Sequence, residues 1–421
     1  MTELDMVVAL AKVAVIFAMV VGFVPVLIWM ERKGAAYIQD RRGPNRASIM
    51  CVRAGGFLHS IADAIKLFSK EEVAVAAAFR PAYLAAPIIA FFVATVTVAV
   101  VPFSEPASFG GFPFSLQVAD LKAGLVYVLA VSSLGVYAVM LAGWASGNKF
   151  SLLGAMRACA QTISYELAIG LAALALFMLA GSLSLSAIVE DQGFWPWRWN
   201  AVRQPLAFAI FFTAMLAEAR RLPFDLPEGE SEIVAGYHTE YSSMRFAMFF
   251  MGEYAHIAVG SMIMATLFLG GWQLPFCESG WITENFNLVL AVVWPGAALA
   301  LIAVGAMLAK RFRRAYRDAR DFEPLLFGAL AAAAGLALLA ALALGGGEEI
   351  PAWLPAAFLT ALQTLTLLAK TLILCCAFIW VRWTLPRFRY DQLMHLGWKV
   401  LLPLAMINVV VTAVAVLMYG G

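Results

Sequence analysis

Long apolar stretches with few charged residues recur along the whole chain. Each is long enough to cross the roughly 30 Å hydrocarbon layer of a bilayer as a helix of about 20 residues. The pattern therefore predicts an all-α polytopic membrane protein. The expected spans cover residues 6–30, 82–102, 121–144, 157–180, 202–217, 246–270, 285–309, 324–345, 356–381 and 397–418.

The composition agrees with this pattern. Of the 421 residues, 63% are hydrophobic and only 13% are charged, with a mean hydropathy of +0.84. These values lie outside the range of soluble globular chains. The N-terminal "MTELDM" is acidic and precedes the first basic residue, Lys12. This charge order is wrong for a cleaved secretory signal, so we expect the first span to be retained.

The basic residues predict the orientation in the membrane. Most Lys and Arg residues lie in or beside alternate connecting segments, whereas the other connections are acidic or neutral. Because positive charge marks the cytoplasmic side, both termini are expected on the outer side. The small net charge of +2 gives no indication of nucleic acid binding. The basic segments are 31–81, 145–157, 218–245, 310–323 and 382–399.

Two of the cytoplasmic connections, 31–81 and 218–245, are long and mix charged with apolar residues. The first contains "GGFLHSIADAIKLFSKEE", in which apolar residues recur at roughly helical spacing. This pattern predicts an amphipathic helix in the membrane interface. A simple interfacial anchor is the plainer interpretation of the same pattern.

The second connection contains "FDLPEGESEIVAGYHTEY", with five carboxylates in eighteen residues. Asp225 and Glu228 match a helix capping box around Pro227, which leaves the other three acids unexplained. Crowding and burial raise carboxyl pKa values, so such a cluster can take and release protons near neutral pH. The five acids are Asp225, Glu228, Glu230, Glu232 and Glu240.

Four further charges, Glu166, Glu218, Glu253 and Lys370, fall within or at the edges of predicted spans. Placing a charge at the centre of a membrane helix costs at least about 2.5 kcal/mol, so such residues face a protein interior or a wet cavity. Each could be part of a structural ion pair. As a set beside the acidic loop, they favour a proton or ion route.

Two arginine-rich stretches stand at the inner ends of predicted spans. "WMERKGAAYIQDRRGPNR" contains Glu31 and Arg32, and "PRFRYDQLMHLGWK" contains Arg387, Arg389 and Asp391. Topology alone could explain these arginines. The acids paired with them suggest a further role.

The cysteines and histidines do not indicate a metal site. The five cysteines include no C-x-x-C pair, and the four histidines are scattered. Neither set has the spacing of metal or iron–sulfur ligands. Any redox chemistry is therefore expected to use electrons carried by another chain.

Seven stretches together resemble one family, the quinone-site membrane subunit of respiratory complex I. In bacteria this is the H-type subunit of NADH–quinone oxidoreductase, and in mitochondria NADH dehydrogenase subunit one. The matching stretches are long, in the family's order, and extend from residue 31 to residue 399. They are "ERKGAAYIQDRRGPNR", "ADAIKLFSKE", "LAGWASGNK", "RACAQTISYE", "EARRLPFDLPEGESE", "EYSSMRFAMFFMGEY" and "VRWTLPRFRYDQLMHLGWK".

The resemblance implies a subunit of the H+-translocating NADH:quinone oxidoreductase, in the bacterial cytoplasmic membrane, with no complete active site of its own. Its expected partners are peripheral iron–sulfur and quinone-site subunits on the cytoplasmic side, and small and antiporter-like membrane subunits. Flavin and iron–sulfur clusters would belong to those partners. Ubiquinone or menaquinone would enter from the lipid as substrate, and no cofactor would be bound covalently.

The resemblance also implies roles for individual residues. A quinone chamber would be lined by residues at the inner end of the first span and by residues of the acidic loop. Two arginines would stabilise the entrance of the chamber. A second group would begin a proton relay. The chamber set is Glu31, Arg32, Arg221, Asp225, Glu228, Glu230, Glu232, Arg387 and Arg389, and the relay set is Tyr165, Glu166, Glu218, Glu240, Glu253 and Lys370.

The chain departs from the family pattern in sequence and in length. Arg220 stands where Asn is expected, His59-Ser60 replaces Gln-Pro, and Cys159 replaces a small aliphatic residue. The family has eight helices, so two of the ten expected spans are additional. We expect residues 279–350 to form an inserted transmembrane hairpin in a single membrane domain, 1–421, where 31–81 and 218–245 form the quinone-chamber loops.

Two other functions fit part of the pattern. A membrane subunit of an energy-converting hydrogenase or formate hydrogenlyase would share the fold and some acids without using quinone. The extended arginine and "GESE" motifs favour the quinone enzyme. A stand-alone ion transporter would be expected to have inverted repeats and broken helices, and the sequence indicates neither.

Overall fold

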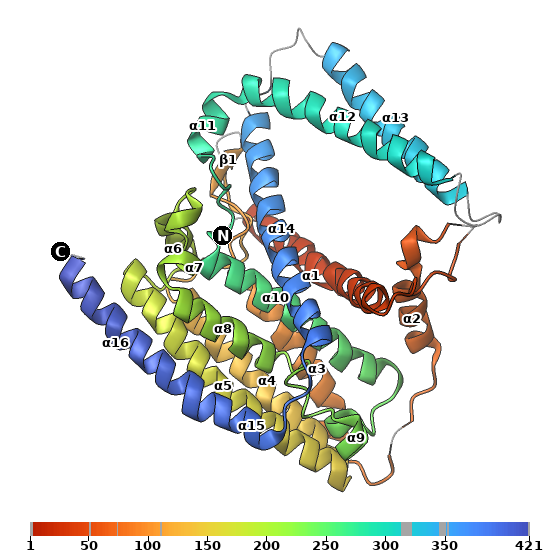
Figure 1. The fold of residues 1–421 in the computed structure, drawn as a ribbon, viewed down its shortest axis with the longest axis vertical. Coiled ribbons are helices and arrows are strands. Elements are labelled where there is room, and N and C mark those ends of the chain that lie inside the picture. The colour runs from red at the N-terminus through yellow and green to blue at the C-terminus, as the bar shows by residue number, and fades with distance from the viewer. Residues whose placement is uncertain are drawn as a thin grey trace.

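The computed structural model describes residues 3–49, 52–73, 75–109, 112–312, 322–344, 351 and 353–419, which are almost entirely helical (Figure 1). Within them, nine helical segments are long and apolar enough to cross a membrane. The all-α polytopic prediction is confirmed. The nine are α1 (Glu3–Ile38), α3 (Arg80–Val96, extended by the 3-10 turn Thr97–Val100), α4 (Gly124–Ala145), α5 (Lys149–Ala180), α10 (Ser243–Phe268), α12 (Phe286–Phe312), α13 (Phe322–Leu344), α14 (Leu354–Thr384), and α15 (Tyr390–His395) continued through the π-helical turn Leu396–Leu401 into α16 (Leu402–Tyr419).

Shorter elements connect these segments. The two strands form a small antiparallel hairpin in which Ala107 pairs with Phe114. The remaining elements are α2 (Leu58–Ser69), β1 (Ala107–Phe109), β2 (Phe112–Phe114), α6 (Leu185–Gln192), α7 (Asn200–Arg203), α8 (Pro205–Glu218), α9 (Glu230–Ile233), α11 (Ser279–Glu284) and 3-10 turns at Ala54–Gly56, Pro196–Arg198 and Gly236–His238.

The span expected at residues 202–217 is shorter than a full crossing. It forms α8, with 14 residues and a length of about 21 Å. That length is less than the roughly 30 Å hydrocarbon layer. The preceding α7 and a 3-10 turn lead the chain to its outer end.

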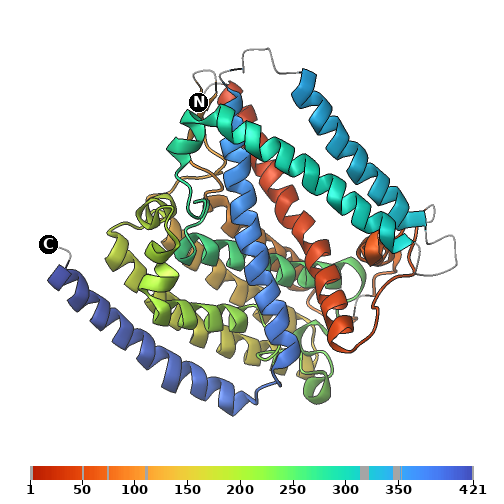
Figure 2. The same cartoon turned by 45° about the horizontal axis from the view of Figure 1, so that its top comes forward.

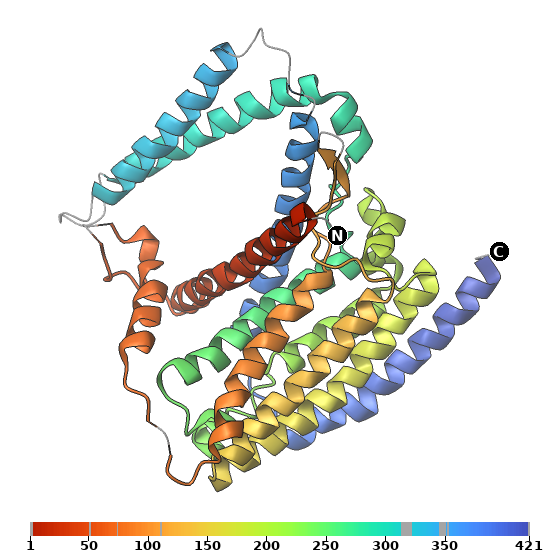
Figure 3. The ribbon, with the colours of Figure 1, turned by 180° about the vertical axis from the view of Figure 1, so that it is seen from behind.

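The helices pack as a row, seen from behind in Figure 3: α10, α3, α4, α5 and α16 each contact the next. α8 lies against α5 and α10, and α14 packs on α10 and α1. Helix α10 is central, because 67% of its most apolar 18-residue stretch is buried inside the protein. Polar side chains on α10 can therefore be shielded from lipid.

The acidic loop 219–242 is held directly against α5. The Asn148 side chain caps α5 by accepting a hydrogen bond from the Phe150 N–H at 2.9 Å. It also donates to Glu240 at 2.5 Å. A Cβ on Gly154 would lie 2.7 Å from the Gly236 Cα, so only glycine allows this approach. The loop is thus held against α5 at two points, Gly236 and Glu240.

The expected hairpin forms from α12 and α13, which lie apart from the row (Figures 1 and 2). The two helices pack chiefly on each other. A Cβ on Gly305 would lie 2.6 Å from the Gly328 carbonyl oxygen, a close packing typical of small residues between membrane helices. At its inner end, the Glu323 carboxylate accepts a hydrogen bond from the Gly55 N–H at 3.2 Å.

The amphipathic helix predicted between residues 55 and 72 forms α2. It contacts α10 and α1 with one side. Ile65 and Phe68 on the other side are largely exposed. An exposed apolar face on a helix beside the membrane segments is what an interfacial position requires.

Candidate functional site

Glu31 joins three helices, α1, α14 and α10. It lies near the end of α1 and is 8% exposed. One carboxylate oxygen is paired with Arg382 of α14. The other accepts a hydrogen bond from the Tyr254 hydroxyl of α10 at 2.9 Å. A buried charge needs such partners, because removing it from water costs several kcal/mol.

Arg221 forms a second link, between the acidic loop and α10. Its guanidinium lies 3.0 Å from a carboxylate oxygen of Glu253, and 4.3 Å from the ring centre of Tyr254. Burial by itself lowers the pKa of Arg221, but Glu253, Tyr254, Glu31 and Glu228 together raise it above its usual value. The guanidinium therefore remains charged inside the protein.

Glu228 and Glu253 lie close enough for their carboxyl groups to interact electrostatically. The Tyr237 hydroxyl donates to Glu253 at 2.8 Å, and His238 lies 3.5 Å from Glu228. Burial would raise the pKa of Glu228, but hydrogen bonds to Glu253 and His238 and the charge of Arg221 lower it. Glu228 is thus the ionised partner, held by cationic neighbours.

We call Glu31, Arg221, Glu228, Glu253 and Arg382 the buried charge cluster. These side chains come from α1, the acidic loop, α10 and α14. An open cavity of about 560 Å³ lies beside it, lined by Glu31, Arg32, Arg41, Arg46, His59 and Trp383 among others. Its volume is within the range of small-molecule sites.

Asp225 lies at the edge of the loop, where Arg387 donates to it at 2.9 Å. Burial and the nearby Glu228 raise its pKa to about 6, and Arg387 acts in the opposite direction. Asp225 therefore changes charge close to neutral pH. The capping box expected for Asp225 and Glu228 is wrong, since the following helix, α9, begins at Glu230 and both acids contact other side chains.

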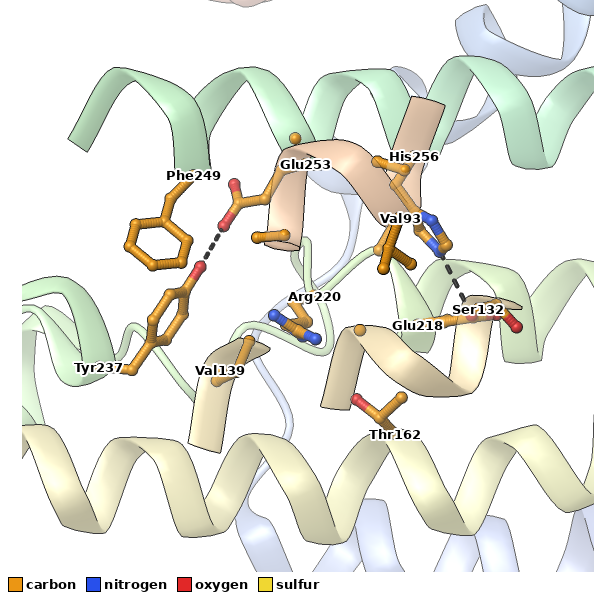
Figure 4. Close-up of a pocket in the computed structure, with 15 residues that line it drawn as sticks. Val93, Ser132, Val139, Thr162, Glu218, Arg220, Tyr237, Phe249, Glu253 and His256 are labelled. Carbon is orange, nitrogen blue, oxygen red and sulfur yellow. Dashed lines mark hydrogen bonds and ion pairs between the residues drawn. The ribbon is translucent and has the colours of Figure 1, made fainter. Parts of the chain in front are cut away.

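A second polar group, which shares Glu253 with the buried charge cluster, lies around a cavity of about 60 Å³ (Figure 4). That volume has room for a few water molecules. Arg220 and Tyr237 reach it from the loop, Glu218 from the end of α8, and Glu253 and His256 from α10. His256 lies 3.4 Å from Glu218. Glu166 of α5 is near enough to interact electrostatically with Glu218.

Other expected chamber residues lie towards the surface. Arg32 pairs with Asp63 at 2.6 Å, and Glu232 with Arg157 at 2.6 Å. Arg389 pairs with Asp391, and both side chains are exposed. Exposed pairs of this kind contribute at most about 1 kcal/mol. The side chain of Glu230 lies outside the described residues.

Two residues of the expected relay have other contacts. The Tyr165 hydroxyl is buried and donates to the Leu393 carbonyl at 3.0 Å, which fastens α5 to α15. The Lys370 ammonium donates to the carbonyls of Leu269, Gly271 and Gln273 at 2.7–3.0 Å. A cation at a helix C-terminus is stabilised by the helix dipole, so Lys370 holds the C-terminal end of α10.

Several side chains that contact the expected acids could not be predicted from the sequence pattern. Arg382 enters it only as a topology marker, and Tyr254, Tyr237, His238 and His256 have no assigned role in it. The polar aromatic residues inside "VAGYHTEY" and "GEYAH" are the available signal. Among the described residues, no group of His, Cys, Asp and Glu could hold a metal ion.

Comparison with known proteins bears on this arrangement. The family model described as NADH dehydrogenase matches residues 11–315 and 324–413. The chain belongs to this family. It is a multi-pass membrane subunit of the NADH–quinone oxidoreductase kind. The matched residues include both helices of the hairpin.

Curated relatives agree over almost the whole length, and three are named as the first H-type subunit of NADH–quinone oxidoreductase in their organisms. The chain is 41% identical over 410 residues to the protein from Solibacter usitatus, covering 96% of each chain. It is 41% identical over 409 residues to the protein from Geobacter metallireducens, covering 97% of this chain and 96% of the relative. The protein from Cytophaga hutchinsonii is 37% identical over 391 residues, covering 93% of this chain and 91% of the relative.

Proposed function

We propose that this chain forms a wall of the quinone chamber in a proton-translocating NADH:quinone oxidoreductase, and that it carries the first part of the proton relay. The quinone enters from the lipid near α1 and α2. Peripheral subunits that carry flavin and iron–sulfur clusters deliver electrons from the cytoplasmic side. Small and antiporter-like membrane subunits continue the relay. The protein lies in the bacterial inner membrane with both termini outside.

One observation carries this proposal: the buried charge cluster connects the acidic loop with three membrane helices. Glu31 and Arg221 both contact Tyr254, so a charge change at the loop reaches α1 and α10 through short contacts. The close pair of Glu228 and Glu253 gives the cluster two interacting carboxyl groups that can respond to a nearby reduction. Burial makes each such electrostatic change large.

The open cavity beside the cluster supports the quinone path. Glu31 and Arg32 line it together with Trp383 of α14. A quinone headgroup has carbonyl oxygens that accept hydrogen bonds, and arginines are suitable donors. The ring of Trp383 offers an apolar face to the rest of the molecule.

Glu253→Gln tests the proposal in the assembled enzyme. Gln retains the size of Glu253 but removes its charge and its titrating proton. We expect proton translocation coupled to quinone reduction in membrane vesicles to fall about tenfold or more, as is usual when a proton-transfer group is lost. The matched control is Glu284→Gln, at an exposed position of α11.

Assembly is checked in both variants by co-purification of the other subunits. Full coupled activity in an assembled Glu253→Gln enzyme would remove the cluster from the relay. An equal loss in Glu284→Gln would mean that the assay reports a general effect of charge removal.

A further inference from the structure

His256 occupies a position between two acids of the proposed relay. It lies one turn after Glu253 on α10, so both side chains project towards the same side. Its Nε2 is 3.4 Å from a carboxylate oxygen of Glu218. That nitrogen is buried, and it makes no contact with hydrogen-bond geometry to any described residue. It is therefore close to Glu218 and able to accept another partner.

The imidazole also stands between two small cavities. One, of about 60 Å³, is lined by Glu253, Arg220, Glu218 and His256. The other, of about 20 Å³, is lined by Thr97, Ser132, Glu218 and His256. Both volumes admit at least one water molecule. The first cavity has several charged groups in its wall, whereas the wall of the second is mainly apolar apart from Glu218, His256 and two hydroxyl groups. Water in the first cavity would connect the region of Glu253 to the imidazole.

The charged groups around His256 come from three neighbouring elements. Glu218 faces it from α8, Arg220 from the loop, and Glu253 from its own helix (Figure 4). Tyr237 closes the far side of the cavity. Glu166 of α5 acts on Glu218 from beyond. The packed faces of α3 and α4 contribute only Val93, Ala94, Thr97, Ser132 and similar residues that do not titrate near neutral pH.

We propose that His256 is a proton-carrying residue that connects Glu253 to Glu218 through the water of this cavity. The imidazole accepts a proton from cavity water that Glu253 has protonated, and becomes an imidazolium beside the Glu218 carboxylate. It then gives a proton to that carboxylate and returns to neutral imidazole. Only N–H and O–H bonds form and break, and one proton moves from Glu253 to Glu218.

Arg220 has a defined part in this step. Its guanidinium lines the same cavity, and its positive charge opposes the passage of free cations through the cavity water. Imidazole is a far stronger base than water, so it can bind the proton in a field that disfavours hydronium. His256 thus supplies the carrier where Arg220 makes open water a poor route.

The proposal rests on the proposed function and is tested in the full enzyme complex. His256→Asn and His256→Gln both remove the titrating ring while keeping a polar side chain. We expect proton translocation coupled to quinone reduction to fall about tenfold at pH 6. The deficit should shrink towards pH 8, because imidazolium forms less readily there in the unsubstituted enzyme. His395→Asn, at an exposed histidine outside both cavities, is the matched control.

Glu253→Gln is measured in parallel, so that the two ideas fail separately. Normal coupling in both assembled His256 variants, beside a loss in Glu253→Gln, would overturn the role of His256 alone. Normal coupling in all three would overturn the proposed function as well. A deficit of equal size from pH 6 to pH 8 would show a purely structural role and would also overturn the proposal.

Discussion

Helices α10 and α13 have similar lengths but opposite surroundings. In the most apolar 18-residue stretch of each helix, 67% of α10 is buried inside the protein, compared with 11% of α13 and 17% of α12. Helix α10 carries Arg245, Glu253 and His256, and each has a charged partner. The described part of α13 has a charge only at its first turn, Glu323. Burial, rather than membrane crossing itself, decides where charges can be placed.

The two regions therefore have different tasks. In the row that contains α10, polar groups are shielded and close to one another, so their charges influence each other strongly. In the hairpin, apolar side chains face outwards and small residues pack inwards. The first arrangement suits proton chemistry, and the second suits contact with lipid. Four substitutions would break or sharpen this contrast.

The largest effect is expected from Arg221→Met. Removing the guanidinium leaves Glu253 and Glu228 without their shared cation, and breaking one side of a buried ion pair costs about 3–5 kcal/mol. We expect little assembled complex in the membrane, measured by co-purification of partner subunits. Arg203→Met, at a partly exposed pair with Asp191, should assemble normally. A fully assembled Arg221→Met enzyme would contradict the central role of this contact.

A smaller effect is expected in the hairpin. Gly328→Val places two methyl groups where a single Cβ would already lie 2.8 Å from the Gly305 carbonyl oxygen. Overpacking of this kind costs about 1–3 kcal/mol. The thermal stability of the purified chain should fall correspondingly, while NADH:quinone activity of the assembled enzyme remains within about twofold. A large loss of activity would mean that the hairpin belongs to the working machinery.

Nine of the ten spans, the hairpin, the amphipathic helix and the position of the acidic loop could be predicted from the sequence, whereas the stretch 202–217 forms only the shorter α8. Their signals are hydropathy, charge bias and spacing, which are local properties. The partners of each acid could not be predicted. Glu31 meets Arg382 across 351 residues, and no spacing rule reaches that far. Lys370 is grouped with the acids in the sequence because it is charged and lies mid-span, yet its ammonium meets only carbonyls and the Trp199 ring among the described residues.

Asp225→Asn tests the edge of the cluster through pH. The folded-state pKa of Asp225, about 6, lies above its ordinary value of 3.8. The folded protein therefore binds more protons, and the free energy of unfolding falls as pH rises from about 4 to 6. Asn does not titrate, so the variant should gain thermal stability relative to the unsubstituted protein on going from pH 5 to pH 8. A loss of thermal stability in the variant, relative to the unsubstituted protein, over that pH range would contradict a raised pKa of Asp225.

The smallest effect is expected from Glu232→Gln. Its partner Arg157 is held at 2.6 Å, but half of the Glu232 side chain is exposed. Exposed pairs contribute at most about 1 kcal/mol. We expect assembly to be normal and coupled quinone reduction to fall less than about threefold in membrane vesicles. A loss as large as that of Glu253→Gln would mean that the exposed loop acids contribute as much to coupled quinone reduction as the buried acids do.

Helix α14 is fastened at two heights. Near the middle of α14, Lys370 donates to carbonyls that directly follow the C-terminus of α10, and 12 residues further on, about 18 Å along the axis, Arg382 pairs with Glu31. Two such contacts along one helix restrict both its rotation about the axis and its translation along the axis, unless both contacts break. A displacement of α14 would therefore have to break both contacts, whereas the acidic loop reaches this region through Arg221 and Tyr254. Because Trp383 of α14 lines the open cavity, the two contacts also fix one wall of that cavity.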